Sequence, residues 1–204
     1  IIPIGLTGYD NISGGGFHRT LIPKYSFKDL LIRLKWLLEN FESIPEFKTG
    51  LDEYDENTYG PMIKPNFRDY EVKENIPGDL YNILYNGTGN VRAIPYGEIK
   101  KDKIYLKGKA PGFKTANLEN DIDDKKLEVK TFKDISANKD DPYFILGEFI
   151  PKNKKTDVKK LYIKLWKKYF IKNFSYRCFF VENEIPIQMG IDKVLINNYI
   201  KYTE

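Results

Sequence analysis

Three charged residues have the types and spacing found in metal-dependent nucleases. Asp121, or in its place Asp123, is followed by Glu128 and Lys130, and in such enzymes paired carboxylates hold Mg²⁺ while a lysine orients the attacking water. However, residues 71–73 form a second Glu-x-Lys triplet, and 30% of the chain is charged, so composition alone makes such triplets common. A Mg²⁺-dependent nuclease using these three residues is therefore the alternative hypothesis. The main hypothesis includes no catalytic residue, no metal and no cofactor.

Other residue types that support catalysis are scarce. His18 is the only histidine and Cys178 the only cysteine, so a Ser–His or Cys–His pair would rest on one histidine, and multi-cysteine zinc sites are excluded. The glycines at 14–16 and 87–89 are not followed by the residues that complete a phosphate-binding loop. These observations favour a protein that binds over one that catalyses.

The composition is that of a folded protein without a membrane span. The 204 residues are 41% hydrophobic and 15% aromatic, enough for one packed domain with a substantial extension. No apolar run approaches the roughly 18–20 residues of a membrane helix. The net charge is only +4, with the lysine excess in residues 152–172, so we expect a local basic face and neither nucleic acid nor a membrane as partner.

The cysteine content and the first residues bear on location and processing. A single cysteine is typical of a reducing compartment, so we expect the cytoplasm or a virion. The chain begins Ile1-Ile2-Pro3, with neither a starting methionine nor the basic-then-apolar pattern of a signal peptide. This start indicates a trimmed chain or a fragment.

The clearest predicted element is an amphipathic helix at residues 27–41. Seven apolar residues recur there at helical spacing and form one stripe. Ser26, followed three residues later by Asp29, supplies a capping start, and Pro45 follows the end. The helix lies in a predicted N-terminal arm, residues 1–91, whose aromatic residues we expect to bind partners: Phe17, Phe27, Trp36 and Phe41.

The rest of the chain reads as an irregular connection followed by strands. Residues 45–80 alternate prolines, acids and single aromatics without a period. Residues 81–150 hold short β-branched and aromatic runs between turn signals. Residues 156–174 fit a helix better than a strand, and alternation over 176–181 and 193–200 predicts further strands.

Residues 104–118 carry a strand, a proline-glycine turn and a second apolar start. Ala110 precedes the turn residues Pro111, Gly112 and Phe113, and four mostly polar residues separate these from Leu118. Proline fixes φ and glycine accepts positive φ, so this segment predicts a tight turn.

This order and spacing resemble the α-crystallin domain of small heat-shock proteins, and the match covers about residues 94–132. The resemblance implies a hairpin over 118–130 with four inward side chains: Leu118, Ile122, Leu127 and Val129. It further implies a mainly β fold, an antiparallel α-crystallin-like sandwich over 92–204 with an inserted segment at 134–175.

Small heat-shock proteins also carry an isoleucine-x-isoleucine tag that docks on a neighbouring subunit. Ile185-Pro186-Ile187 is similar to that tag, as is Ile2-Pro3-Ile4, and an extended segment of this kind fills adjacent pockets with Ile185 and Ile187. The other reading makes them core residues of a strand. Together the patterns predict a non-catalytic protein that oligomerises, either a structural component of a large complex, for instance a phage virion or tail, or an ATP-independent holdase chaperone for unfolded clients.

Overall fold

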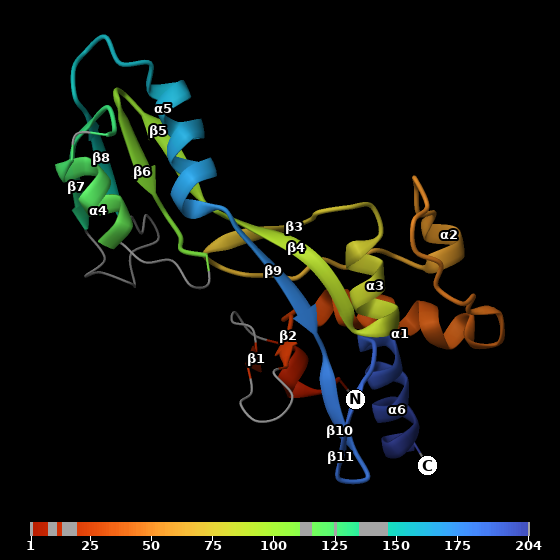
Figure 1. Ribbon diagram of the computed structural model, residues 1–204. Coiled ribbons are helices and arrows are strands. Elements are labelled where there is room, and N and C mark those ends of the chain that lie inside the picture. Colours follow the sequence, from red (N-terminus) through yellow and green to blue (C-terminus); the bar gives the residue numbers. More distant parts are fainter. Residues whose placement is uncertain are drawn as a thin grey trace. The chain divides into compact units, whose positions relative to one another are not determined.

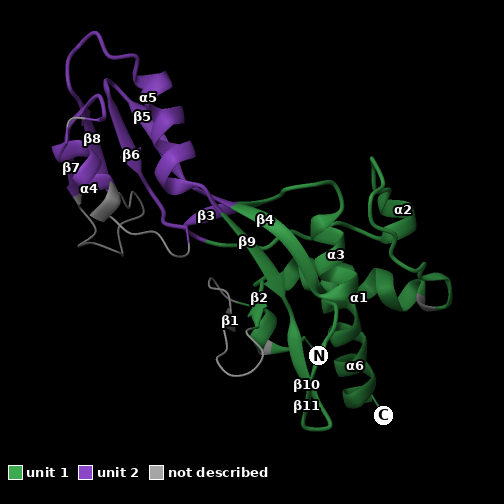
Figure 2. Cartoon of the chain, viewed as in Figure 1, with its two compact units in different colours: residues 1–67, 72–92, 173–204 green, residues 68–71, 93–172 purple. Residues whose placement is uncertain are grey.

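The computed structural model describes residues 2–7, 12–13, 20–110, 116–124, 126–134 and 147–203. The chain forms two compact units (Figure 2). Unit 1 comprises Ile1–Phe67, Val72–Arg92 and Asn173–Glu204, and unit 2 comprises Arg68–Glu71 and Ala93–Lys172. The fold combines helices with antiparallel sheets. The predicted division of the chain at residue 92 differs from these two units, because residues 173–204 group with unit 1.

The helices of unit 1 include the one predicted with most support. Its helical elements are η1 (Ile4–Leu6), α1 (Phe27–Glu39), η2 (Phe41–Ser43), α2 (Glu56–Tyr59), α3 (Asp79–Asn86) and α6 (Ile191–Thr203). The Asp29 amide donates to the Ser26 hydroxyl at 3.1 Å, which confirms the predicted cap of α1. The side chains of Leu30, Leu34 and Leu37 are buried.

Two sheets contain the strands of unit 1. The larger sheet also includes a few residues that are assigned to unit 2. The larger has the order β1-β2-β9-β4-β3, with β1 (Ile12–Ser13), β2 (Leu21–Ile22), β3 (Tyr70–Glu74), β4 (Thr88–Pro95) and β9 (Lys172–Arg177). The unit boundaries fall within β3, β4 and β9. The smaller sheet is a hairpin of β10 (Phe179–Glu182) and β11 (Ile185–Gln188).

Unit 2 is built on one antiparallel sheet and two helical segments (Figure 1). The strands are β5 (Gly97–Lys100), β6 (Lys103–Leu106), β7 (Val129–Asp134) and β8 (Gly147–Pro151), in the order β5-β6-β8-β7. The helices are α4 (Ala116–Asp123) and α5 (Val158–Leu165), the latter continued by the π-helical turn η3 (Trp166–Phe170). Their apolar sides share one core with the sheet, including Ile104, Leu118, Phe149, Leu165 and Trp166.

The predicted hairpin over 118–130 is wrong, because its first half is helical. Leu118 and Ile122 lie in α4, and their spacing of four residues suits one face of a helix as well as a strand. Leu118, Leu127 and Val129 are nevertheless buried. The predicted turn at Pro111, Gly112 and Phe113 lies outside the described residues, as do Phe17 and His18.

Three further predictions of element type need correction. The connection at 45–80 contains α2 and β3, and residues 79–86 form α3, not a strand. Gly78 and Gly87 bound α3 at φ of 89° and 71°, the left-handed conformation that glycine accepts most readily. Residues 193–200 lie in α6, whose apolar residues face α1 and α3, so packing overrides their strand propensity.

The other predicted elements are found where the patterns place them. α5 and η3 cover residues 158–170 of the helix predicted at 156–174, and β9 and β10 cover most of the strand predicted at 176–181. The Trp166 indole donates to the Pro95 carbonyl at 2.8 Å, which satisfies a buried donor where α5 ends.

Candidate functional site

The β10–β11 hairpin is held to the rest of unit 1 at its base. The amide of Cys178 donates to the Gly87 carbonyl at 2.7 Å, and the amide of Met189 donates to the Cys178 carbonyl at 3.1 Å. The amide of Phe179 donates to the Thr20 hydroxyl at 3.1 Å. These bonds fix the hairpin where it begins and where it ends.

The tip of the hairpin has a defined geometry. Asn183 and Glu184 form a two-residue turn, with φ of 50° and 64°. Two consecutive positive φ values are typical of a type I′ turn, whose twist matches that of paired strands. The turn sets the register, with Glu182 opposite Ile185 and Val181 opposite Pro186.

The hairpin exposes apolar side chains on both faces. Val181 is 75% exposed, Ile185 is 61% exposed and Ile187 is 36% exposed. The register puts Ile185 and Ile187 on one face and Val181 on the other. The reading of Ile185 and Ile187 as core residues is therefore wrong, and both lie where a partner can reach them.

The two outer edges of the hairpin differ in their hydrogen-bonding capacity. The pair next to a two-residue turn, here Glu182 and Ile185, exchanges backbone hydrogen bonds, and the following pair, Val181 and Pro186, does not. The backbone polar groups of Val181 and Pro186 therefore point away from the partner strand. Pro186 has no amide hydrogen, which leaves the β11 edge short of a donor. At Val181 the β10 edge keeps both a donor and an acceptor.

Of the four aromatic residues predicted to bind partners, the two with described side chains, Phe27 and Trp36, lie on different sides of α1. Phe27 is 58% exposed, whereas Trp36 lies nine positions further along α1, on its opposite side. The Trp36 ring stacks on the Arg33 guanidinium, 5.0 Å from the ring centroid. The side chains of Phe17 and Phe41 are outside the description. Phe27 instead continues into an exposed apolar ridge with Leu31 and Leu38.

Beside this ridge lies an open pocket of about 690 Å³. α1 and the segment that contains α2 supply its lining: Ile32, Lys35, Trp36, Glu39, Asn40, Glu56, Asn57 and Pro61. The lining mixes both signs of charge with apolar surface, and so it selects no single chemistry of ligand.

A buried ion pair in unit 1 went undetected in the sequence. Arg33, fully buried, donates from Nε and Nη2 to the two carboxylate oxygens of Asp192 at 3.0 and 2.7 Å. Its Nη1 donates to the carbonyls of Tyr59 and Pro61 at 2.6 and 3.2 Å. Burial raises the pKa of the Asp192 carboxyl, and the hydrogen bonds with Asp192 raise the pKa of Arg33. The pair joins α1, α6 and the segment after α2.

The residues of the nuclease hypothesis lie in unit 2, where Asp121 already has strong partners. Lys168 Nζ lies 2.6 Å from one carboxylate oxygen, Lys126 Nζ lies 3.6 Å from the other, and the Tyr169 hydroxyl donates to the carboxylate. The bonds from Lys168 and Tyr169 lower the pKa of Asp121 to about 2, and Asp121 raises the pKa of Lys168 to about 12. These interactions hold α4 against η3.

The other two residues of that hypothesis are not gathered with Asp121 into an evident metal site. Glu128 precedes β7 and Lys130 lies within it, and both are exposed. The Glu128 carbonyl accepts from the Lys152 amide at 2.9 Å, so its backbone has a structural role. Over the described ranges, no three or more His, Cys, Asp or Glu side chains are grouped so as to hold a metal ion.

No protein-family model matches the chain, and a search of curated proteins finds no significant match. Among the described helices, none has the length and apolar character needed to cross a membrane.

Proposed function

We propose that this protein is a non-catalytic assembly protein that binds protein subunits, including further copies of itself, through the β10–β11 hairpin. The carrying observation is the exposure of Val181, Ile185 and Ile187 on a hairpin whose base is fixed. Ile185 and Ile187 share one face of the hairpin and Val181 lies on the other, so both faces offer exposed apolar surface of the kind that marks interaction sites. A two-stranded hairpin is also marginally stable in water, so burial between subunits would stabilise it.

A structural component of a larger complex, such as a virion or tail, fits these features better than a holdase chaperone does. A holdase binds varied clients through an adaptable aromatic arm, but Trp36 is partly buried on Arg33. The hairpin has a set turn and register, which suits one partner in one geometry. We retain the α-crystallin-like resemblance as a proposal for β5, β6 and β7 only, since these strands lie in a single sheet packed against helices and α4 does not belong to that pattern.

The non-catalytic assignment is supported by the state of Asp121. A carboxylate already neutralised by Lys168 and Lys126 offers little to Mg²⁺ unless those bonds break. We therefore expect no Mg²⁺-dependent cleavage of DNA by the purified chain. Cleavage that disappears in Lys130→Ala would establish the nuclease in place of the assembly role.

Sedimentation velocity of the full chain over a concentration series tests the assembly role. The wild-type protein should shift to larger species as its concentration rises, and the variant Val181→Ser/Ile185→Ser should remain small. Ile163→Ser is the matched control, because Ile163 is 51% exposed on α5 in unit 2; it should behave as the wild type does.

A holdase predicts a different set of results. Polydisperse oligomers that suppress heat aggregation of a model client without ATP, unaffected by the hairpin substitutions, would replace the assembly role with a chaperone role. A wild-type chain that stays monomeric at every concentration would exclude self-assembly through the hairpin.

A further inference from the structure

The two units carry opposite charge, which the net value of the whole chain conceals. Unit 2 holds 21 Lys and Arg against 14 Asp and Glu, and unit 1 holds 12 against 15. The formal charge of unit 2 is therefore +7, while that of unit 1 is −3. The expectation that nucleic acid is not a partner was based on the net charge of +4 for the whole chain. It does not apply to unit 2 taken by itself.

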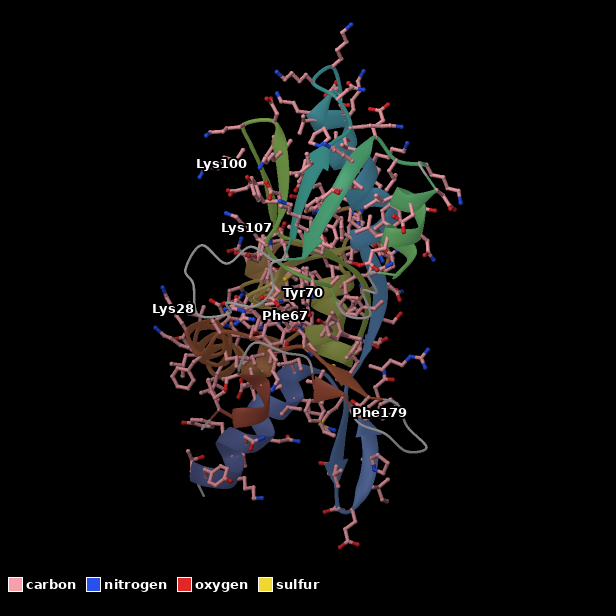
Figure 3. All side chains as sticks on the ribbon, turned by 90° about the vertical axis from the view of Figure 1, so that its left-hand side faces the viewer. Lys28, Phe67, Tyr70, Lys100, Lys107 and Phe179 are labelled. Carbon is pink, nitrogen blue, oxygen red and sulfur yellow. The ribbon has the colours of Figure 1, made fainter. Side chains whose placement is uncertain are left out.

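The lysines of unit 2 gather at one end of its sheet. β5 pairs with β6 up to Lys100↔Lys103, and β6 pairs with β8 from Leu106↔Gly147 to Ile104↔Phe149. This register brings the β5–β6 turn and the segment after β8 to the same end, as Figure 1 shows. Lys100 extends away from the turn into solvent (Figure 3). The exposed lysines of this end are Lys100, Lys101, Lys152, Lys154 and Lys155.

α5 continues this surface. Its buried side is apolar, with Leu161, Leu165 and then Trp166 in the core, while its exposed side presents lysine at nearly every position. The exposed lysines of α5 and η3 are Lys159, Lys160, Lys164, Lys167 and Lys168. Lys159, Lys164 and Lys167 follow one another at spacings of five and three residues, which correspond to about 7.5 and 4.5 Å along a helix axis, so the charges form a row.

Most of these lysines lack an acidic partner. Asp157 caps α5 and lies 3.8 Å from Lys160, and Asp121 engages Lys168. In the part of the chain that is described, no carboxylate pairs with the following six: Lys152, Lys154, Lys155, Lys159, Lys164 and Lys167. A row of uncompensated ammonium groups repels itself, and a ligand that carries many negative charges relieves this repulsion.

We propose that this lysine surface of unit 2 binds the phosphate backbone of duplex nucleic acid without regard to sequence. A duplex presents one negative charge per about 1.7 Å of its axis, which supplies a dense array for the lysine row. Because lysine acts as a point charge, it contacts phosphate without reading base edges. The apolar side of α5 is buried in the core and its exposed side offers Ile163 among lysines, so this helix has too little exposed apolar surface to insert into a lipid surface.

Fluorescence anisotropy of the full chain with two labelled duplexes of unrelated sequence tests the proposal. Both should bind with similar affinity, and if the six unpaired lysines each meet a phosphate, log K should fall with log salt with a slope of about −5. In Lys159→Gln/Lys164→Gln/Lys167→Gln the slope should become shallower by about 2.7, and binding should weaken about tenfold or more. Far-UV circular dichroism verifies that the variant is folded.

The matched control removes the same charge from unit 1. Lys28, Lys48 and Lys193 are exposed there, and their triple glutamine variant should bind duplex as the wild type does. Equal losses in both triple variants would overturn the proposal, as would no binding at low salt. Tighter binding to phosphatidylserine vesicles than to duplex would also overturn it, in favour of a lipid surface. The inference is independent of the hairpin, since none of these lysines lies in β10 or β11.

Discussion

Asp192 and Arg33 form a buried ion pair on which the stability of unit 1 should depend. Replacing one partner of a buried ion pair leaves the other charge buried without compensation, which costs about 3–5 kcal/mol. We expect Asp192→Asn to reduce the free energy of unfolding by about that amount, measured by urea denaturation. Glu39→Gln is the control, because Lys35 and Glu39 form an exposed pair on the same helix at 3.7 Å, and its loss should cost under about 1 kcal/mol. Similar losses in the two variants would contradict a special role for the buried pair.

Asp121 makes the stability of unit 2 depend on pH in the acid range. Its pKa is lowered from 3.8 to about 2, first by the hydrogen bond from Lys168 and then by that from Tyr169. An acid whose pKa is depressed by folding contributes stability above its unfolded pKa and loses it as the pH falls through the folded value. Stability should therefore decline between about pH 4 and pH 2, and Asp121→Asn should flatten this decline in thermal melts. Asp123→Asn, an exposed site on the same helix, should leave the decline unchanged.

The sequence could not reveal the ion pair between Arg33 and Asp192, because the two residues are far apart in the chain. Arg33 and Asp192 are separated by 159 positions. Arg33 falls on the leucine stripe of α1, between Leu30 and Leu37, but no neighbouring residue identifies Asp192 as its partner. By contrast, the Ile185-Pro186-Ile187 pattern is local, and the structure places it on an exposed strand, while the docking role predicted for it stays a prediction. The turn that presents this strand was not recognised, because Glu184 is an uncommon residue at positive φ.

At the scale of elements, one substitution in the turn should make the β10–β11 hairpin more stable. Glu184 adopts φ of 64°, a conformation that costs a residue with a side chain about 1–2 kcal/mol and glycine much less. Glu184→Gly would create the Asn-Gly turn preferred in type I′ hairpins, so we expect slower amide hydrogen exchange in β10 and β11. Glu182→Gly is the control, because it places glycine within a strand, where it weakens pairing. Faster exchange in Glu184→Gly would contradict the assigned turn.

The elements differ in how strongly local sequence determines them. α1 has a serine cap and leucines at helical spacing, so its existence and start follow from neighbouring residues. α6 follows Gly190 in place of a capping serine, and its isoleucines, asparagines and tyrosines have weak helix propensity. Contacts with α1 and α3 favour the helix at α6, and these contacts join residues that are distant in the chain.

At the scale of the whole molecule, the order of the chain conceals its organisation. Unit 1 is assembled from three segments, so residues 173–204 belong with residues 1–67 although about a hundred positions intervene. Sequence patterns act over short windows and led to a division into an arm and a following domain. The charge of each unit became visible only after the structure had grouped the segments.

The separate cores of the two units should make the effects of core substitutions local. Leu165 is fully buried in the core of unit 2, and Leu37 is fully buried in unit 1. Truncating either to alanine removes the same side chain and costs about 2–5 kcal/mol. Because each leucine packs within its own unit, Leu165→Ala should accelerate hydrogen exchange mainly over residues 68–71 and 93–172, and Leu37→Ala mainly over 1–67, 72–92 and 173–204. Mass spectrometry of peptic fragments measures both patterns, and equal acceleration in both units from either substitution would mean that the chain unfolds as a single cooperative body.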